Sequence, residues 1–122
     1  MKRCLIIDDS DIIRKVARNF IEREQYEVEE TENAEAAVKV CMQRMPDVIL
    51  LDWHLPGMSS FEFLTALRFT AGAKRPFILY CTTENDAADL TRAFNAGADA
   101  YLMKPFDHQS FAAKFRGIGL AA

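Results

Sequence analysis

The sequence predicts an α/β fold in which helices cover both faces of a five-stranded parallel sheet. Short apolar runs alternate with longer segments of helical periodicity along the 122 residues, the pattern of repeated βα units. Three of the apolar runs also end in charged residues, which are Asp8 with Asp9, Asp52, and Lys104. Because parallel strands end at one edge of their sheet, these charges are predicted to share a site.

The first strand and helix follow from residues 4–21. Residues 4–7 are continuously apolar, which favours a strand covered on both faces. Ser10 and Asp11 then offer a helix cap. Apolar residues at three- and four-residue spacing predict a helix whose stripe faces the core. The stripe consists of Ile13, Val16, Ala17, Phe20 and Ile21.

The next elements are a more exposed strand, a second helix and a third strand. Residues 26–30 alternate in polarity, as expected for a strand with one solvated face. A helix is predicted over residues 34–45, because Asn33 offers a cap and Pro46 stops the helix. Residues 48–51 form another continuous apolar run, which predicts a buried strand.

Cap residues divide the second half of the chain. Ser59 or Ser60 caps a third helix, Pro76 opens the fourth strand, Gly97 ends the fourth helix with a left-handed cap, and Asp107 caps the last helix. The fourth and fifth strands are predicted at residues 77–81 and 100–103. The third helix is predicted to end near residue 69, the fourth to span residues 84–95, and the fifth to end near residue 116.

Five βα units with right-handed crossovers, at this chain length, favour a doubly wound sheet of the flavodoxin-like order 2-1-3-4-5. In this order the first and third strands are neighbours, so Asp8, Asp9 and Asp52 converge where the strand order reverses. The fourth and fifth strands bring Thr82 and Lys104 to the same edge. We therefore expect a single domain over residues 1–122, with five helices on the two faces of the sheet.

Composition narrows the functional classes. The net charge of −3 gives no electrostatic reason to expect direct nucleic-acid binding. No apolar run approaches the roughly 18 residues of a membrane span, and the first residues do not resemble a signal peptide. The chain is therefore expected to be soluble and cytoplasmic. Cys4, Cys41 and Cys81 lack metal-type spacing, and each lies in an apolar segment, so we predict buried, reduced thiols.

The charged residues predict a site for a cation and a phosphoryl group. Three crowded carboxylates suit a hard, oxygen-seeking cation, and Mg²⁺ fits best because it takes few carboxylates and retains water or phosphate oxygens. Lys104 supplies a fixed positive charge, and Thr82 supplies a hydroxyl donor. The other strand ends carry no His, Ser or Cys as nucleophile. Asp52, central and opposite the lysine, is therefore the predicted phosphoacceptor.

These residues resemble the receiver domain of bacterial two-component response regulators, over essentially the whole chain. Three segments and Thr82 carry the resemblance: residues 8–10, residues 51–57 and residues 104–106. The resemblance implies that a histidine kinase or a histidine phosphotransferase phosphorylates Asp52.

The resemblance also assigns metal ligands. It makes Asp9 a direct Mg²⁺ ligand and Asp8 a ligand through water. Asp52 and the backbone carbonyl of His54 complete the set. The imidazole of His54 is expected to face solvent, because Mg²⁺ prefers oxygen.

The same resemblance implies a conformational switch. Thr82 would rotate onto the phosphoryl group, Lys104 would pair with it, and Tyr101 would follow the threonine inward. The downstream protein would bind the face formed by the fourth helix, the fifth strand and the fifth helix, around residues 87–94, Tyr101 and Phe106. The Lys104–Pro105 peptide bond would be cis. Catalysis would be limited to the domain's own phosphorylation and dephosphorylation, without metabolic turnover.

Three positions depart from the family pattern. Ser59 and Ser60 replace the usual acidic residue or Asn followed by Gly, so the loop before the third helix loses its flexible residue. Thr83 replaces Ala or Gly, and its branched side chain is expected to slow hydrolysis relative to Thr83→Ala. His54 and Glu84 occupy the variable positions that tune phosphoryl lifetime.

Several alternatives remain open at this stage. The chain ends directly after the last predicted helix, which favours a stand-alone receiver, a relay component, or a fragment of a longer regulator. A binding module independent of phosphorylation has the same fold. A haloacid-dehalogenase-type phosphatase also uses Mg²⁺ and an aspartate nucleophile. That class requires Asp-x-Asp after the first strand, whereas this chain has the run of residues 8–11, Asp-Asp-Ser-Asp, and no evident cap domain. Ile12 is either a peripheral core residue or part of a docking surface for the phosphodonor. Arg14 and Arg18 are expected on a solvated helix face.

Overall fold

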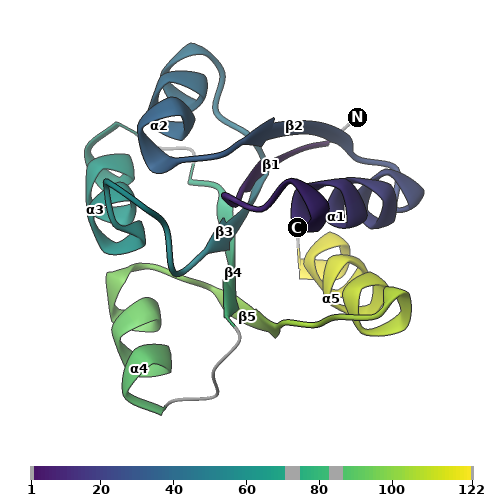
Figure 1. Cartoon of the computed structure of the whole chain (residues 1–122). Coiled ribbons are helices and arrows are strands. Elements are labelled where there is room, and N and C mark those ends of the chain that lie inside the picture. The colour runs from purple at the N-terminus through teal and green to yellow at the C-terminus, as the bar shows by residue number, and fades with distance from the viewer. Residues whose placement is uncertain (1, 71–74, 83–86, 122) are drawn as a thin grey trace.

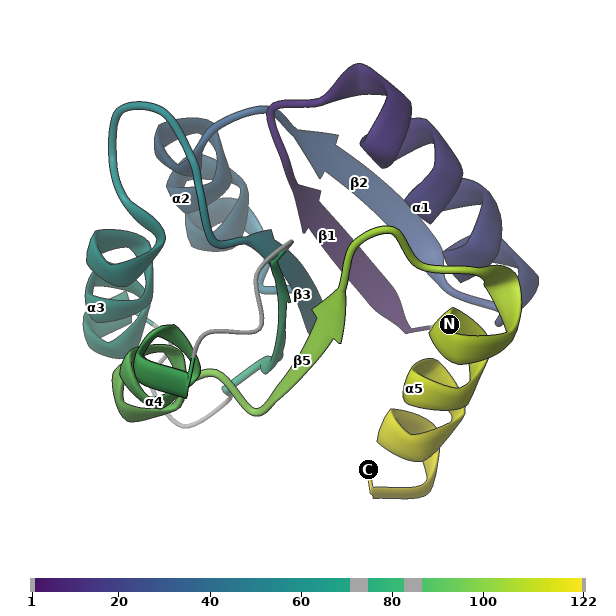
Figure 2. The same ribbon diagram turned by 60° about the horizontal axis from the view of Figure 1, so that its bottom comes forward.

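The computed structural model describes residues 2–70, 75–82 and 87–121. Five parallel strands form one sheet in the order β2-β1-β3-β4-β5, which confirms the predicted topology. Helices α1 and α5 cover one face of the sheet, and α2, α3 and α4 cover the other (Figures 1 and 2). The elements are β1 Arg3–Ile7, α1 Asp11–Arg23, β2 Glu27–Thr31, α2 Ala34–Gln43, β3 Val48–Asp52, α3 Ser60–Thr70, β4 Phe77–Thr82, α4 Ala87–Ala96, β5 Ala100–Met103 and α5 His108–Ala121.

The central strands are apolar throughout because both of their faces are buried. In β1, Leu5 and Ile7 pack with α2, α3 and α4, whereas Cys4 and Ile6 pack with α1 and α5. The neighbouring strand β3 follows the same alternation, since its register with β1 pairs Ile7 with Leu51. Burying each such aliphatic side chain contributes about 1.5–3 kcal/mol. Strand β2 lies at the sheet edge and is more exposed, as predicted.

The predicted helix caps form hydrogen bonds to backbone amides. The side chain of Ser10 accepts from the amide of Ile13, and that of Asn33 accepts from the amide of Ala36. At α5, the carboxylate of Asp107 accepts from the amide of Ser110. Each of these bonds satisfies one of the donors that a helix leaves unpaired at its start.

Ser59, not Ser60, caps α3. The hydroxyl of Ser59 accepts from the amide of Glu62 at 3.0 Å, and the carboxylate of Glu62 accepts from the amide of Ser59 at 3.3 Å. This reciprocal pair is a capping box. The side chain of Ser60, the first residue of the helix, is therefore available for a different contact.

Two helix ends differ from the sequence prediction. Helix α2 ends at Gln43, two residues early, because Arg44 is extended at φ −158° and its carbonyl accepts from the Arg3 side chain. Helix α5 continues past residue 116 to Ala121. Ile118 continues the buried face of this helix, which outweighs the roughly 1 kcal/mol that glycine costs in a helix. For α4, residues 84–86 lie outside the described part of the chain.

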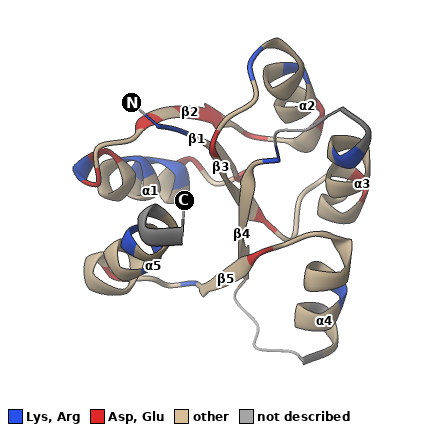
Figure 3. Ribbon diagram, turned by 180° about the vertical axis from the view of Figure 1, so that it is seen from behind, with Lys and Arg blue, Asp and Glu red and all other residues tan. Residues whose placement is uncertain are grey.

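The first helix also departs from expectation. Its apolar stripe is buried at Ala17 and Ile21, but 36 % of Val16 is exposed. Ile12, beside the stripe, is 75 % exposed. Ile12 is therefore not a core residue. The basic residues of α1 lie beside acidic residues of β2 (Figure 3), and Arg14 and Arg18 both pair with Glu30.

The cysteines agree with the sequence prediction. Cys4, Cys41 and Cys81 are free and buried. Burial raises the pKa of all three thiols, and that of Cys41 rises to about 11. Within the described part of the chain, the helices are too short or too polar to cross a membrane.

An acidic site at the carboxyl edge of the sheet

Three carboxylates meet where β1 and β3 end. Asp8 and Asp9 follow the last residue of β1, and Asp52 is the last residue of β3. Each offers an oxygen that lies within 4.8 Å of the other two. Asp8 and Asp52 are buried, whereas Asp9 is exposed. The parallel register places the strand ends at one level, as the sequence predicts.

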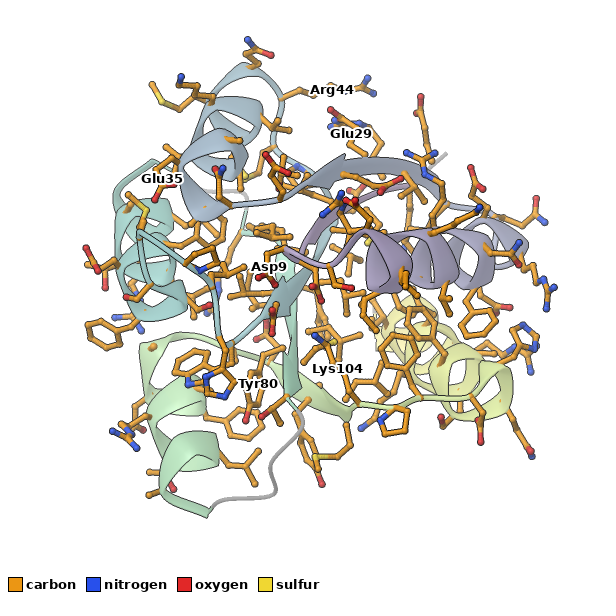
Figure 4. The ribbon with its side chains drawn as sticks, in the orientation of Figure 1. Asp9, Glu29, Glu35, Arg44, Tyr80 and Lys104 are labelled. Atoms are coloured by element: carbon orange, nitrogen blue, oxygen red, sulfur yellow. The ribbon has the colours of Figure 1, made fainter. Side chains whose placement is uncertain are left out.

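Lys104 brings a positive charge to these carboxylates. Its ammonium donates a hydrogen bond of 2.7 Å to Oδ2 of Asp8 and lies 3.4 Å from Oδ1 of Asp52. Its backbone amide donates to the carbonyl of Thr82 at 2.8 Å, which ties the end of β5 to β4. Only 12 % of the lysine side chain is exposed. Figure 4 shows Asp9 and Lys104 over the middle of this sheet edge.

Burial and neighbouring charges shift the pKa values of Asp52 and Lys104. Burial raises the pKa of Asp52, and the nearby charge of Asp8 raises it further, while Lys104 and the amide of His54 oppose the rise. Burial acts to lower the pKa of Lys104. The hydrogen bond to Asp8 and the charges of both carboxylates outweigh that effect, so the lysine pKa is raised. The site therefore keeps the ammonium charged beside carboxylates that repel one another.

The remaining predicted site residues occupy different environments. Thr82 ends β4 and is buried, and Tyr101 lies half-buried in β5 with the ammonium of Lys114 5.2 Å from its ring centre. His54 is exposed, and its backbone amide donates to Oδ1 of Asp52 at 3.3 Å. The Lys104–Pro105 bond is cis, as the resemblance implies. Thr83 and Glu84 lie outside the described residues.

The donor set suits a hard divalent cation. All three side chains of the cluster offer carboxylate oxygens, the ligands that Mg²⁺ takes in proteins. Two of the three carboxylates are buried, so bringing them together without a cation costs electrostatic free energy. The residues present therefore fit Mg²⁺.

Comparison with known proteins identifies the family. A family model described as response regulator receiver domain matches residues 4–116. The chain belongs to this family. The receiver domain is 30 % identical over 117 residues to the phosphate regulon transcriptional regulatory protein PhoB of Klebsiella pneumoniae, covering 96 % of this chain and 51 % of PhoB. It is 35 % identical over 102 residues to the transcriptional regulatory protein SrrA of Staphylococcus aureus, covering 84 % of this chain and 41 % of SrrA.

Solved structures show the same relationship. The chemotaxis response regulator CheY4 of Vibrio cholerae is similar with a TM-score of 0.89 and 30 % identity, over 97 % of this chain and 98 % of CheY4. A putative response regulator from Chloroflexus aurantiacus has a TM-score of 0.88 and 28 % identity, over 96 % of both chains. The receiver domain spans about half the length of the curated relatives that it matches.

Arg14 is a site residue that sequence reasoning missed. Only 13 % of its side chain is exposed, and its guanidinium donates to the carbonyl of Asp8 at 2.6 Å while pairing with Asp11 and Glu30. The expectation of a solvated arginine is therefore wrong. The pairing with Asp11 has the spacing of a helical ion pair and was visible in the sequence. The contact with the Asp8 backbone depends on how α1 leaves β1.

Proposed function

We propose that the receiver domain is a phosphorylation-dependent switch, in which the carboxylate of Asp52 accepts a phosphoryl group from a histidine kinase or a histidine phosphotransferase. One observation carries the proposal: the Asp52 carboxylate lies 3.4 Å from the Lys104 ammonium and beside the carboxylates of Asp8 and Asp9. Phosphoryl transfer needs a nucleophile with positive charge beside it. Lys104 supplies one such charge, and a cation held by the carboxylates would supply the other.

In the proposed reaction, an oxygen of Asp52 attacks the phosphorus of a phosphohistidine on the partner. The O–P bond forms as the P–N bond breaks, and the electron pair of the broken bond remains on the imidazole nitrogen. An imidazole protonated on its other nitrogen then leaves in neutral form. The product is an acyl phosphate on Asp52, and the Lys104 ammonium pairs with its oxygens.

The cation-binding residues would be Asp8, Asp9, Asp52 and the backbone carbonyl of His54. When bound, Mg²⁺ supplies positive charge that offsets the negative charge of the phosphoryl group. The chain's own residues do the rest. Lys104 balances the buried carboxylates, and the His54 amide orients the carboxylate of Asp52.

The switch and the interaction surfaces follow the family pattern. We assign the switch to Thr82 and Tyr101, with a downstream protein bound by the α4–β5–α5 face. For the phosphodonor, we assign a docking surface that contains Ile12 and Val16. Both are exposed apolar residues on α1, and Ile12 is four residues from Asp8. An apolar surface beside the acceptor suits a partner helix.

Mass spectrometry of the intact protein tests the phosphoacceptor. After incubation with Mg²⁺ and acetyl phosphate, the wild type should gain one labile phosphoryl group. Asp52→Asn should gain none, whereas the control Asp11→Asn should gain one, because Asp11 is an exposed acid outside the cluster. An unlabelled wild type would favour a binding module independent of phosphorylation. Release of phosphate from many monoesters would favour a phosphatase.

A further inference from the structure

The hydroxyl of Ser60 contacts the backbone on both sides of Trp53. Ser60 is only 1 % exposed, and its Oγ lies 2.5 Å from the carbonyl oxygen of Asp52 and 3.1 Å from that of Trp53. A serine hydroxyl carries one proton, which these two acceptors share. The first turn of α3 is thereby attached to the end of β3.

The two peptide units that follow Asp52 are consequently held at both ends. In the Asp52–Trp53 unit, the carbonyl accepts from Ser60 and the amide of Trp53 donates to the carbonyl of Cys81 at 3.0 Å. In the Trp53–His54 unit, the carbonyl accepts from Ser60 and the amide of His54 donates to Oδ1 of Asp52 at 3.3 Å. Ser60 is therefore linked to the Asp52 carboxylate through one peptide plane.

We propose that Ser60 is a positioning residue that fixes the Asp52 carboxylate through the Trp53–His54 peptide, an inference that rests on the function proposed above. A peptide unit is planar, so holding its carbonyl also fixes the direction of its N–H. The 3.3 Å bond from His54 is long for an N–H···O bond, and a small rotation of the plane would break it. Without the Ser60 hydroxyl, the carboxylate loses an orienting donor.

Ser59 provides a matched control one residue away. Its hydroxyl accepts from the amide of Glu62 within α3. Ser59→Ala therefore removes the same chemical group from the same helix start without touching Asp52 or Trp53. A general weakening of α3 affects both variants, whereas a loss of positioning affects Ser60→Ala alone.

Two measurements on the full chain test the inference. By NMR, hydrogen exchange of the His54 amide should accelerate about fivefold in Ser60→Ala, because the hydrogen bond from this amide to Asp52, worth about 1 kcal/mol, is lost. The exchange should stay unchanged in Ser59→Ala. By intact mass, the rate of phosphorylation by acetyl phosphate with Mg²⁺ should fall about three- to tenfold in Ser60→Ala. It should remain at the wild-type value in Ser59→Ala and recover in Ser60→Thr, which restores the hydroxyl.

The outcomes separate this inference from the proposed function. Equal His54 exchange in the two alanine variants overturns the role of Ser60, whether or not the protein is phosphorylated. Faster exchange in Ser60→Ala with an unlabelled wild type overturns the proposed function and leaves the link from Ser60 to the carboxylate through the Trp53–His54 peptide supported. Equal phosphorylation rates in both alanine variants would show that the Asp52 carboxylate does not need the His54 amide as an orienting donor. That result would also overturn the inference.

Discussion

The ammonium of Lys104 donates a 2.7 Å hydrogen bond to Asp8, although 96 residues separate the two in the sequence. Both side chains are largely buried, and Asp52 lies 3.4 Å from the same ammonium. One lysine therefore balances two carboxylates that would otherwise repel each other in a low-dielectric environment. The stability of this sheet edge depends on positive charge, which a protein residue or a bound cation supplies.

Removing that charge should destabilise the domain. Lys104→Met keeps much of the side-chain volume but removes the positive charge beside Asp8 and Asp52, so the free energy of unfolding should fall by about 2–3 kcal/mol. Urea denaturation measures this loss. The deficit should shrink when Mg²⁺ is added, because the cation replaces the lost charge. An equal deficit with and without Mg²⁺ would contradict a shared role for lysine and cation.

Mg²⁺ should stabilise the wild type and not Asp9→Asn. A ligand that binds only the folded state stabilises it by about 2.7 kcal/mol at one hundred times its Kd. Asp9 is exposed, so its substitution should leave the metal-free protein folded. Thermal melting with and without Mg²⁺ measures the shift, and Asp11→Asn should retain it. A full Mg²⁺ shift in Asp9→Asn would remove Asp9 from the ligand set.

Replacing each of two glycines with alanine should change the stability of the domain in opposite directions. Gly57 has φ +72°, and a Cβ there would lie 3.1 Å from the carboxylate of Glu35, which accepts from the amide of Met58. Gly57→Ala should therefore cost about 1 kcal/mol. Gly117 lies in α5 with nothing within 4 Å of its added Cβ, so Gly117→Ala should stabilise by about 0.5–1 kcal/mol. Equal effects in urea denaturation would contradict this distinction.

The buried thiol of Cys41 should make the stability of the domain fall as the pH rises above about 9. Burial raises the pKa of its thiol from 9.0 to about 11 in the folded state, so the folded protein keeps a proton that the unfolded chain loses in this range. This stabilisation is complete below pH 9 and falls as pH rises toward 11. The stability difference between wild type and Cys41→Ala should therefore narrow by about 1–2 kcal/mol between pH 8 and pH 11. A constant difference would show that the thiol pKa is not raised.

Ile12→Lys tests the assigned docking surface. Since 75 % of Ile12 is exposed, the substitution should leave stability within about 0.5 kcal/mol of wild type. Phosphorylation by acetyl phosphate should not change, whereas transfer from a phosphorylated histidine phosphotransferase should slow about tenfold. Exposed Met42 on α2 offers a control, and Met42→Lys should leave both rates unchanged. Unaltered protein-to-protein transfer in Ile12→Lys would remove α1 from the docking surface.

Much of the fold could be predicted from the sequence because its signals are local. Continuous apolar runs locate strands buried on both faces, and Ser10, Asn33 and Asp107 cap the helices that they precede. The limits of α2 and α5 could not be predicted in the same way. Helix α5 continues past the predicted end near residue 116 because Ile118 packs against the core. Local sequence signals contain no information about that tertiary contact.

The order of the strands and their parallel direction, which follow from local patterns in the chain, bring Asp8, Asp52 and Lys104 to one edge of the sheet. How these side chains are held depends on the packing of the helices against that edge. The burial of Arg14 against the Asp8 carbonyl depends on the angle at which α1 leaves β1, and the contact of Ser60 with the Asp52 backbone depends on how α3 docks on β3. The capping box between Ser59 and Glu62 is a local signal, whereas the contact of Ser60 with the end of β3 arises from packing.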